Sequence, residues 1–208
     1  MIDAQIRRIS SHNHAQLDQI AKLHIAEIRG GFLSSLGEQV LRDFYYTIAQ
    51  SDGSFIIAAV SDRQQVLGFL AGGIGTHSLY REHLKYRQPL SIIRLAFTLA
   101  LPKRLRKIIE TLRYTEQRND SYPRAEILNF CVDSRAQRAG LGRRLMASAE
   151  AEFADKGIDC IKIITGQTQT KAQNFYRKLG ALYVKDFELH AGTKSTMFLW
   201  HITKSEVV

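Results

Sequence analysis

Apolar positions near the N-terminus repeat with the period of an α-helix. One stripe with the spacing i, i+3, i+4, i+7 consists of Leu17, Ile20, Ala21, His24 and Ile28. A second stripe consists of Val40, Leu41, Phe44, Tyr45 and Ile48. Ser35 and Glu38 have the spacing of a capping box, which predicts where the second helix begins. The place of His24 on the first stripe is typical of a core or rim histidine, although a catalytic role stays open.

Strand-forming residues follow these two helices. The runs 54–60 (SFIIAAV) and 66–71 (VLGFLA) flank the polar stretch 61–65 and predict a β-hairpin, which the glycine-rich residues 72–75 should end. Four more strands are predicted over residues 125–132 (AEILNFCV), 160–164 (CIKII), 183–189 and 196–202. A turn at residues 191–193 would join the last two.

Two further helices are predicted between the later strands. Residues 141–153 carry apolar side chains along one side, and residues 172–179 carry a second such stripe. Thr170 and Gln173 have the spacing that would cap the start of the second helix, and Gly180 would end it. Alternation of strands and helices indicates an α/β fold.

Length and composition are typical of one globular domain, predicted over residues 1–208. The chain has 208 residues, of which 45% are hydrophobic and 24% charged. No apolar stretch follows the first basic residues, and the longest nearly apolar run, 95–101, is too short to cross a bilayer. We therefore expect a cytoplasmic protein. Cys131 and Cys160 lie within predicted buried strands, where cysteine acts as a small hydrophobe, and the spacing predicts no metal site.

Basic residues concentrate in one segment. Between Arg81 and Arg118, ten basic residues stand against three acidic ones, so this segment carries most of the net charge of +9. Apolar positions on either side of Pro102 have helical spacing, which predicts a basic helical insertion at about 79–120. The charge belongs either to a solvated helical face or to a lid for an anionic substrate or an acidic membrane surface. No nucleic-acid-binding motif accompanies it, so nucleic acid is the least favoured partner.

A glycine-rich turn separates the strand 125–132 from the helix 141–153. Its sequence, QRAGLG over residues 137–142, places two glycines where the helix begins. Glycine lets another molecule approach the backbone, and the first N–H groups of a helix have no intrahelical partner. With the helix dipole and Arg138, Arg143 and Arg144, these donors predict an anion site that suits a pyrophosphate. Neither the Rossmann nor the P-loop motif is complete here.

These residues resemble the acetyl-CoA signature of the GNAT acetyltransferase superfamily, [QR]xxGx[GA] between a strand and a helix. Gln137, Gly140 and Gly142 occupy its defined positions, and residues 172–181 (AQNFYRKLGA) resemble the family's later motif AxxFYxxxGA. The resemblance implies a mixed, mainly antiparallel central sheet with a splayed parallel strand pair, flanked by helices, with the basic insertion between the third and fourth strands. It also implies acetyl-CoA as cosubstrate, without a metal.

The resemblance further implies which residues bind the cosubstrate. The pyrophosphate would contact mainly the backbone N–H groups of Gln137, Arg138, Ala139, Gly140, Leu141, Gly142 and Arg143. The pantetheine arm would lie beside Phe130, Cys131 and Val132 and pair with that strand. Gln169 stands where the family often has asparagine, so either Gln169 or Asn174 would contact the pantetheine.

Two residues are candidates for catalysis. Tyr176 matches the family tyrosine that often protonates the departing thiolate, and its alternative role is to pack beside Phe175. Glu126 resembles, by its place on the strand entering the glycine turn, the glutamate base of one branch of the family. An apolar environment would raise its pKa toward the range useful for a general base.

Alternatives to these roles stay open. Glu126 could instead be a strand-end residue paired with a nearby cation such as Arg124, and a water chain through Asn129, His77 or Tyr80 could serve as the base. The predicted acceptor is a primary amine on a small molecule, and the basic insertion would suit an amino sugar on a phosphate carrier. The alternative function is a non-catalytic acyl-CoA-binding or membrane-surface module.

Overall fold

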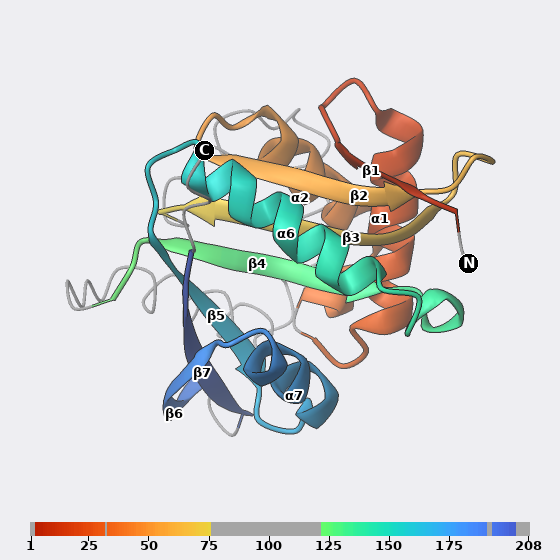
Figure 1. Cartoon of the computed structure of the whole chain (residues 1–208). Coiled ribbons are helices and arrows are strands. Elements are labelled where there is room, and N and C mark those ends of the chain that lie inside the picture. Colours follow the sequence, from red (N-terminus) through yellow and green to blue (C-terminus); the bar gives the residue numbers. More distant parts are fainter. Residues whose placement is uncertain (1–2, 32, 76–121, 191–192, 203–208) are drawn as a thin grey trace.

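The computed structural model describes residues 3–31, 33–75, 122–190 and 193–202. Among these residues seven strands form one sheet (Figure 1), in the spatial order β1 (Gln5–Arg8), β2 (Ser54–Val60), β3 (Val66–Ile74), β4 (Ala125–Val132), β5 (Cys160–Gly166), β7 (Thr193–His201) and β6 (Leu182–His190). Neighbouring strands are antiparallel except β4 and β5, which run parallel. The predicted mixed, mainly antiparallel sheet is confirmed.

Some predictions lie outside the described residues. They concern the basic helical insertion at about 79–120, the loop residues His77 and Tyr80, and most of the turn at 191–193. Within the described part of the chain, no helix has both the length and the apolar character needed to span a membrane.

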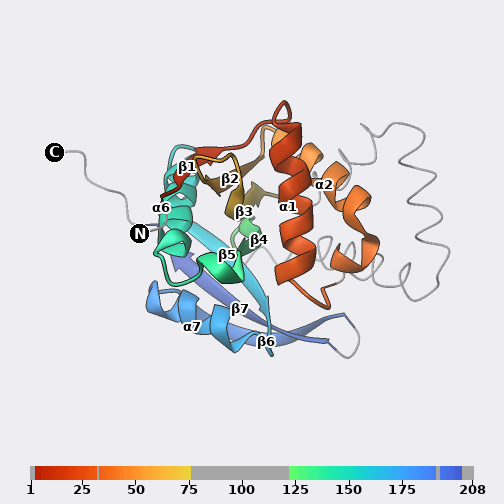
Figure 2. The same cartoon turned by 90° about the vertical axis from the view of Figure 1, so that its right-hand side faces the viewer.

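Helices cover both faces of the sheet (Figure 2). On one face lie α1 (His14–Glu27) and α2 (Glu38–Gln50), with a short 3-10 helix at Leu33–Leu36 between them. On the other face lie α6 (Leu141–Ala154) and α7 (Thr170–Lys178), which contribute side chains to one buried cluster. A second 3-10 helix, Ser134–Ala136, connects β4 to the turn that precedes α6.

The central strands are buried on both sides. All seven residues of β2 are buried, with Phe55 and Ile57 in the cluster beneath α6 and Ile56 and Ala58 in the cluster beneath α1 and α2. Side chains alternate between the two faces of a strand, so helices on both sides require apolar residues at every position. This explains why the strand is hydrophobic at every position after Ser54.

A β-bulge interrupts β4. Ala71 of β3 pairs with Asn129, whereas the next residue, Gly72, pairs with Ile127, so Leu128 is an extra residue without a partner in β3. A bulge bends its strand and reverses which residues face each side. Ile127 accordingly packs in the cluster beneath α6, and Leu128 packs against the cluster beneath α1 and α2.

The strands correct one prediction and add one strand. The glycines after residue 71 do not end the hairpin, because β3 continues through Gly72 and Gly73 to Ile74. Gly72 is required by packing, since a Cβ there would lie 2.5 Å from Cζ of Phe55 and 2.8 Å from Cζ of Phe153. Strand β1 was not predicted from the sequence; its four residues form an edge that, among the described strands, pairs with β2 alone.

Both predicted N-terminal caps are wrong. Helix α2 begins at Glu38 after Gly37, and helix α7 begins at Thr170 itself after Gln169; neither start has a capping hydrogen bond from a side chain. The predicted end of α7 is confirmed, because Gly180 follows the helix with a φ of +90°, a conformation that favours glycine.

Candidate functional site

The parallel strands β4 and β5 separate along the sheet (Figure 1). They share two residue pairs, Glu126 with Lys162 and Ile127 with Ile163. Beyond Ile127, β4 continues to Val132, and no described strand pairs with its edge on the side of β5. The bulge at Leu128 lies where the separation begins. An open edge of this kind offers N–H and C=O groups to an extended ligand, as a partner strand would use them.

The glycine turn lies between the end of β4 and the start of α6. Gly140 precedes the helix with a φ of 79°, and Arg138 also has a positive φ, of 65°. Alternating left-handed residues direct neighbouring N–H groups toward one point, a geometry that binds anions. The N–H of Arg144 bonds to the carbonyl of Gly140 at 3.2 Å, so the preceding N–H groups of α6 lie at the positive end of the helix without intrahelical partners.

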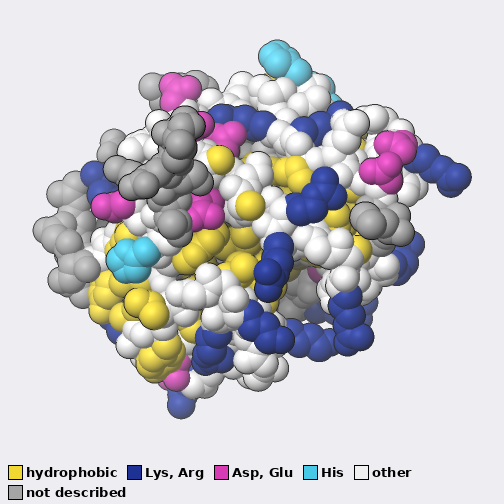
Figure 3. Space-filling view, in the orientation of Figure 1, with side chains coloured by type: hydrophobic (Ala, Val, Ile, Leu, Met, Phe, Trp, Pro, Cys, Tyr) yellow, Lys and Arg dark blue, Asp and Glu magenta, His cyan; other side chains and the backbone are white. Residues whose placement is uncertain are grey.

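Positive charge surrounds this turn. The side chains of Arg138, Arg143 and Arg144 are exposed, as are Arg177 and Lys178 on α7. Figure 3 shows lysine and arginine side chains over α7 and the start of α6 on one face of the molecule. The field at the glycine turn therefore favours an anionic ligand.

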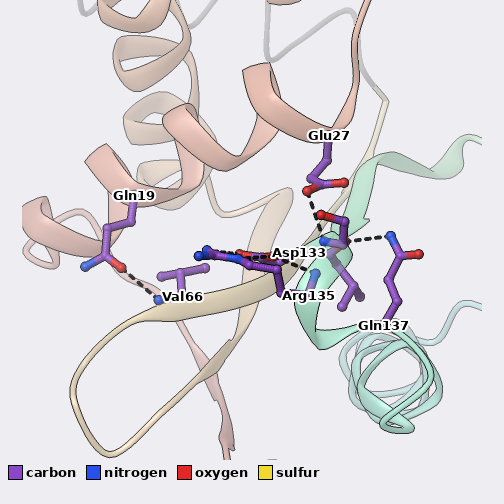
Figure 4. A network of polar contacts seen from close by, with 8 residues as sticks. Gln19, Glu27, Val66, Asp133, Arg135 and Gln137 are labelled. Atoms are coloured by element: carbon purple, nitrogen blue, oxygen red, sulfur yellow. Dashed lines mark hydrogen bonds and ion pairs between the residues drawn. The ribbon is translucent and has the colours of Figure 1, made fainter.

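Side chains from two elements hold the segment that leads into the turn (Figure 4). Glu27 at the end of α1 accepts a hydrogen bond from the N–H of Ser134 at 3.0 Å. The side-chain amide of Gln137 donates to the carbonyl of Val132 at 3.1 Å. The side chain of Gln137 thus ties the turn back to the end of β4.

An aromatic cluster connects the two sequence motifs. Phe130 of β4 and Phe175 of α7 have ring centroids 5.5 Å apart, and Tyr176 lies 5.7 Å from Phe175 and 6.3 Å from Phe130. A Cβ on Gly142, in the first turn of α6, would lie 3.3 Å from the ring of Phe175 and 3.4 Å from that of Phe130. The second glycine of the turn is therefore explained by the close approach of α6 to these rings.

Tyr176 is buried, with an exposed fraction of 5%. Its ring packs beside Phe175 and also lies 6.3 Å from the ring of Phe198. Burial raises the pKa of the phenol above its ordinary value, and the nearby Cys131 adds to this. The hydroxyl therefore keeps its proton at neutral pH. Ring packing agrees with the alternative role, and the role as proton donor stays a prediction.

Glu126 lies where β4 and β5 begin to separate, in an ion pair with Lys162 of β5. Lys162 Nζ is 3.2 Å from Glu126 Oε2, and the lysine and glutamate side chains are 15% and 11% exposed. Burial raises the pKa of the Glu126 carboxyl, and the charge and hydrogen bond of Lys162 partly oppose this. The alternative role of Glu126, an ion pair with a nearby cation, is thus present in the structure, but the cation is Lys162, whereas the guanidinium of Arg124 lies beside Gly75.

Lys162 was missed in the sequence, although a signal was present. It is the single charged residue in the run CIKII, and a lysine inside a buried strand requires a partner.

Two more polar groups of β4 face α1 and α2. Asn129 faces this side because its partner Ala71 belongs to the core cluster there, and its amide nitrogen is buried without a hydrogen-bond partner among the described residues. Such a group normally binds water or a ligand. Cys131 packs against the same cluster as a free thiol, and burial raises its pKa, so the thiol is a poor nucleophile.

The polar residues near the start of α7 have different surroundings. Gln169 accepts a hydrogen bond from the hydroxyl of Thr165 at 2.6 Å, whereas Asn174 is exposed. Gln173 is buried and donates to the carbonyl of Gln167 at 2.9 Å. Predicted only as a cap, Gln173 instead holds α7 against the loop after β5.

Known families and structures account for this arrangement. Residues 18–181 match the profile described as the acetyltransferase (GNAT) family. The chain belongs to the GNAT acetyltransferase family. Among curated proteins, none matches the chain at a significant level.

Solved GNAT structures are similar over nearly the whole chain. The ribosomal-protein-S18-alanine N-acetyltransferase of Escherichia coli has a TM-score of 0.59 at 12% identity, covering 99% of each chain. A GNAT acetyltransferase of Staphylococcus aureus has a TM-score of 0.59 at 12% identity, and the alignment covers 96% of this chain and 100% of the other. Arabidopsis thaliana NAA60, solved with acetyl-CoA, has a TM-score of 0.57 at 16% identity, and the alignment covers 96% of this chain and 99% of the other. These likenesses establish the GNAT fold. The predicted splayed parallel pair is β4 with β5, which separate beyond two shared residue pairs.

The GNAT signature residues meet at the opening between β4 and β5. Residues 130–132 form the open edge of β4, residues 137–143 form the turn at its end, and Tyr176 with Phe175 closes one side. Glu126 lies at the closed end of the opening, beside Lys162. Asn174 lies on the exposed side of α7, so its side chain is directed toward solvent.

Proposed function

We propose that this protein transfers an acetyl group from acetyl-CoA to a primary amine of an acceptor molecule. The observation that carries the proposal is the separation of β4 from β5, which opens between an anion-binding glycine turn and a buried carboxylate. An elongated ligand fits this site, since the glycine turn suits a pyrophosphate at one end and the open edge of β4 suits a peptide-like arm.

Acetyl-CoA would be held mainly by backbone groups. Residues 137–143 offer backbone N–H groups at the start of α6 to the pyrophosphate, and Arg138 and Arg143 add positive charge. The main-chain groups of residues 130–132 are offered to the pantetheine arm. Between Gln169 and Asn174, Gln169 is the better candidate for a side-chain contact with this arm, because it bonds to Thr165 at the end of β5. Bound acetyl-CoA supplies the thioester acetyl group.

Two side chains perform the proton transfers in this proposal. The Glu126 carboxylate takes a proton from the acceptor nitrogen as the nitrogen bonds to the acetyl carbon. The protonated hydroxyl of Tyr176 donates its proton to the sulfur when the carbon–sulfur bond breaks. The raised pKa of Glu126 supports its role, because a higher pKa makes a carboxylate a stronger base, and the Tyr176 phenol carries its proton at neutral pH.

The acceptor would approach from the face of the sheet that carries α1 and α2, toward which Glu126 and Asn129 both point. The charge of residues 81–118 favours an anionic acceptor such as an amino sugar on a phosphate carrier. A cytoplasmic location is part of the proposal, since both cysteines are free thiols, as in a reducing compartment.

Two measurements test the proposal. Isothermal titration with acetyl-CoA measures binding of the donor, and release of CoA thiol in the presence of amines measures transfer. The amine set should include amino sugars with and without a phosphate, polyamines and short peptides. Binding of acetyl-CoA without turnover on any amine would favour the non-catalytic module instead. Turnover on polycationic amines alone would exclude the anionic acceptor.

Gly142→Val is expected to weaken acetyl-CoA binding by about tenfold or more. A side chain at Gly142 meets the rings of Phe175 and Phe130 and must displace them into the proposed binding site. The dissociation constant is measured by titration calorimetry, with the melting temperature checked in parallel. Ala147→Val, at an exposed position of the same helix, is the matched control and should bind as the wild type does. An unchanged dissociation constant for Gly142→Val would contradict the proposed site.

Tyr176→Phe is expected to lower kcat by about tenfold or more with little change in KM. The substitution removes the donor hydroxyl and keeps the ring that packs against Phe130, Phe175 and Phe198. Steady-state thiol release gives both constants. Tyr183→Phe, at a tyrosine that is 54% exposed, is the control. A wild-type kcat in Tyr176→Phe would remove the hydroxyl from the mechanism.

A further inference from the structure

The ion pair between Glu126 and Lys162 occupies a special place in the sheet. These residues form one of the two pairs that join β4 to β5, immediately before the strands separate. Lys162 Nζ lies 3.2 Å from one carboxylate oxygen of Glu126, Oε2. The pair faces the side of α1 and α2, because the β3 partner of Glu126, Gly73, is two residues from Ala71 in the core cluster there.

Fold stability alone does not explain a pair in this position. The lysine and glutamate side chains are only 15% and 11% exposed, so both charges are largely removed from water. Desolvation offsets most of the attraction in such a pair, and apolar residues of similar size are often as stabilising. The pair is thus better explained by what it does for the carboxylate at the opening.

Lys162 is the charged group that lowers the pKa of Glu126. The β3 partner, Gly73, has no side chain, and among the described charged groups Lys162 alone acts on the carboxyl. Burial raises the pKa of Glu126, and Lys162 lowers it through its charge and its hydrogen bond. Without the ammonium group the buried carboxyl would hold its proton at higher pH and be lost as a base.

We infer that Lys162 is a positioning residue for acetyl transfer, which fixes Glu126 through Oε2, keeps the carboxylate ionised and leaves Oε1 to take the proton from the acceptor nitrogen. This inference rests on the proposed role of Glu126 as base. Lys162 itself does not contact the reacting atoms. Its effect should appear in the pH at which Glu126 ionises.

The test compares Lys162→Met, which removes the charge and keeps the length, with Lys162→Arg, which keeps the charge. The pKa of Glu126 is measured by 13C NMR of its side-chain carboxyl carbon, assigned from the signal that disappears in Glu126→Gln. We expect this pKa to rise by about one unit or more in Lys162→Met and to stay within about half a unit in Lys162→Arg. The acid limb of kcat/KM should move to higher pH by the same amount.

Each outcome decides the inference. An unchanged pKa of Glu126 in Lys162→Met would overturn it. A loss of activity that is equal at all pH values, with the acid limb of kcat/KM unmoved, would also overturn it, because such a loss indicates a structural role. If the Met variant does not fold, Lys162→Gln replaces it with the same expected direction. The NMR titration needs no turnover, so absence of acetyl transfer by the wild type would refute the proposed function separately.

Discussion

Glu126→Gln is expected to lower kcat/KM by about 100-fold or more at neutral pH while acetyl-CoA still binds. The amide has the shape of the carboxylate but cannot accept a proton from the acceptor nitrogen. Glu126 lies on the acceptor side of the sheet, at the closed end of the opening, whereas the glycine turn lies at the other end of β4. Thiol-release kinetics measure the first effect, and calorimetric titration with acetyl-CoA measures the second.

Glu152→Gln is the matched control for this variant. Glu152 also pairs with a cation, at 2.7 Å from Arg8, but it lies on α6 away from the opening. It should keep the wild-type kcat/KM. A value for Glu126→Gln within about threefold of the wild type would remove Glu126 from the mechanism. The base would then be a water chain, for which the unpartnered amide of Asn129 is the described candidate.

The parts of the site that the sequence predicted are local in the chain. The glycine turn, the strand before it and the helix after it are consecutive, and their bounds agree with those predicted to within one residue. The position of Gly140 could be predicted because the residue before the helix has a left-handed conformation, which favours glycine. The second motif was recognised in the same way, since Phe175 and Tyr176 are neighbours on one helix.

The parts that the sequence did not predict depend on contacts between distant segments. The partner of Glu126 is set by the register of β4 against β5, so Lys162 is adjacent in the sheet although 36 residues separate the two in the chain. Arg124 was the nearest cation in sequence, but it precedes β4, and its guanidinium lies beside Gly75. Register, rather than proximity in sequence, selected the pair.

The bulge in β4 shows the same limit. The run AEILNFCV is apolar enough to predict a buried strand, yet nothing in its pattern shows that Leu128 is an extra residue. Without the bulge, Asn129 would face α6 and Phe130 would face α1 and α2. With it, Phe130 joins the aromatic cluster and Asn129 faces the acceptor side. One inserted residue therefore determines which face of the sheet each of these two side chains occupies.

The free energy of unfolding is expected to fall by about 3 kcal/mol more between pH 7 and pH 4 in the wild type than in His24→Gln. His24 is buried, with an exposed fraction of 1%, and burial lowers its pKa from 6.5 to about 4. Between these values the unfolded chain binds a proton that the folded protein does not. Stability contributed by the neutral ring is therefore complete above the unfolded pKa and is lost progressively as the pH falls toward 4.

The contact between His24 and Tyr45 supplies the structural reason for this effect. Nδ1 of His24 and the hydroxyl of Tyr45 share a hydrogen bond of 2.5 Å. A protonated ring carries an N–H on both nitrogens, and the buried Nε2 has no hydrogen-bond partner among the described residues. Glutamine can accept from the same hydroxyl and does not titrate, which isolates the effect of the charge. Urea unfolding at a series of pH values gives the free energies, with the exposed His12→Gln as control. Parallel curves for the wild type and His24→Gln would show that His24 accepts a proton in the folded protein as readily as in the unfolded chain.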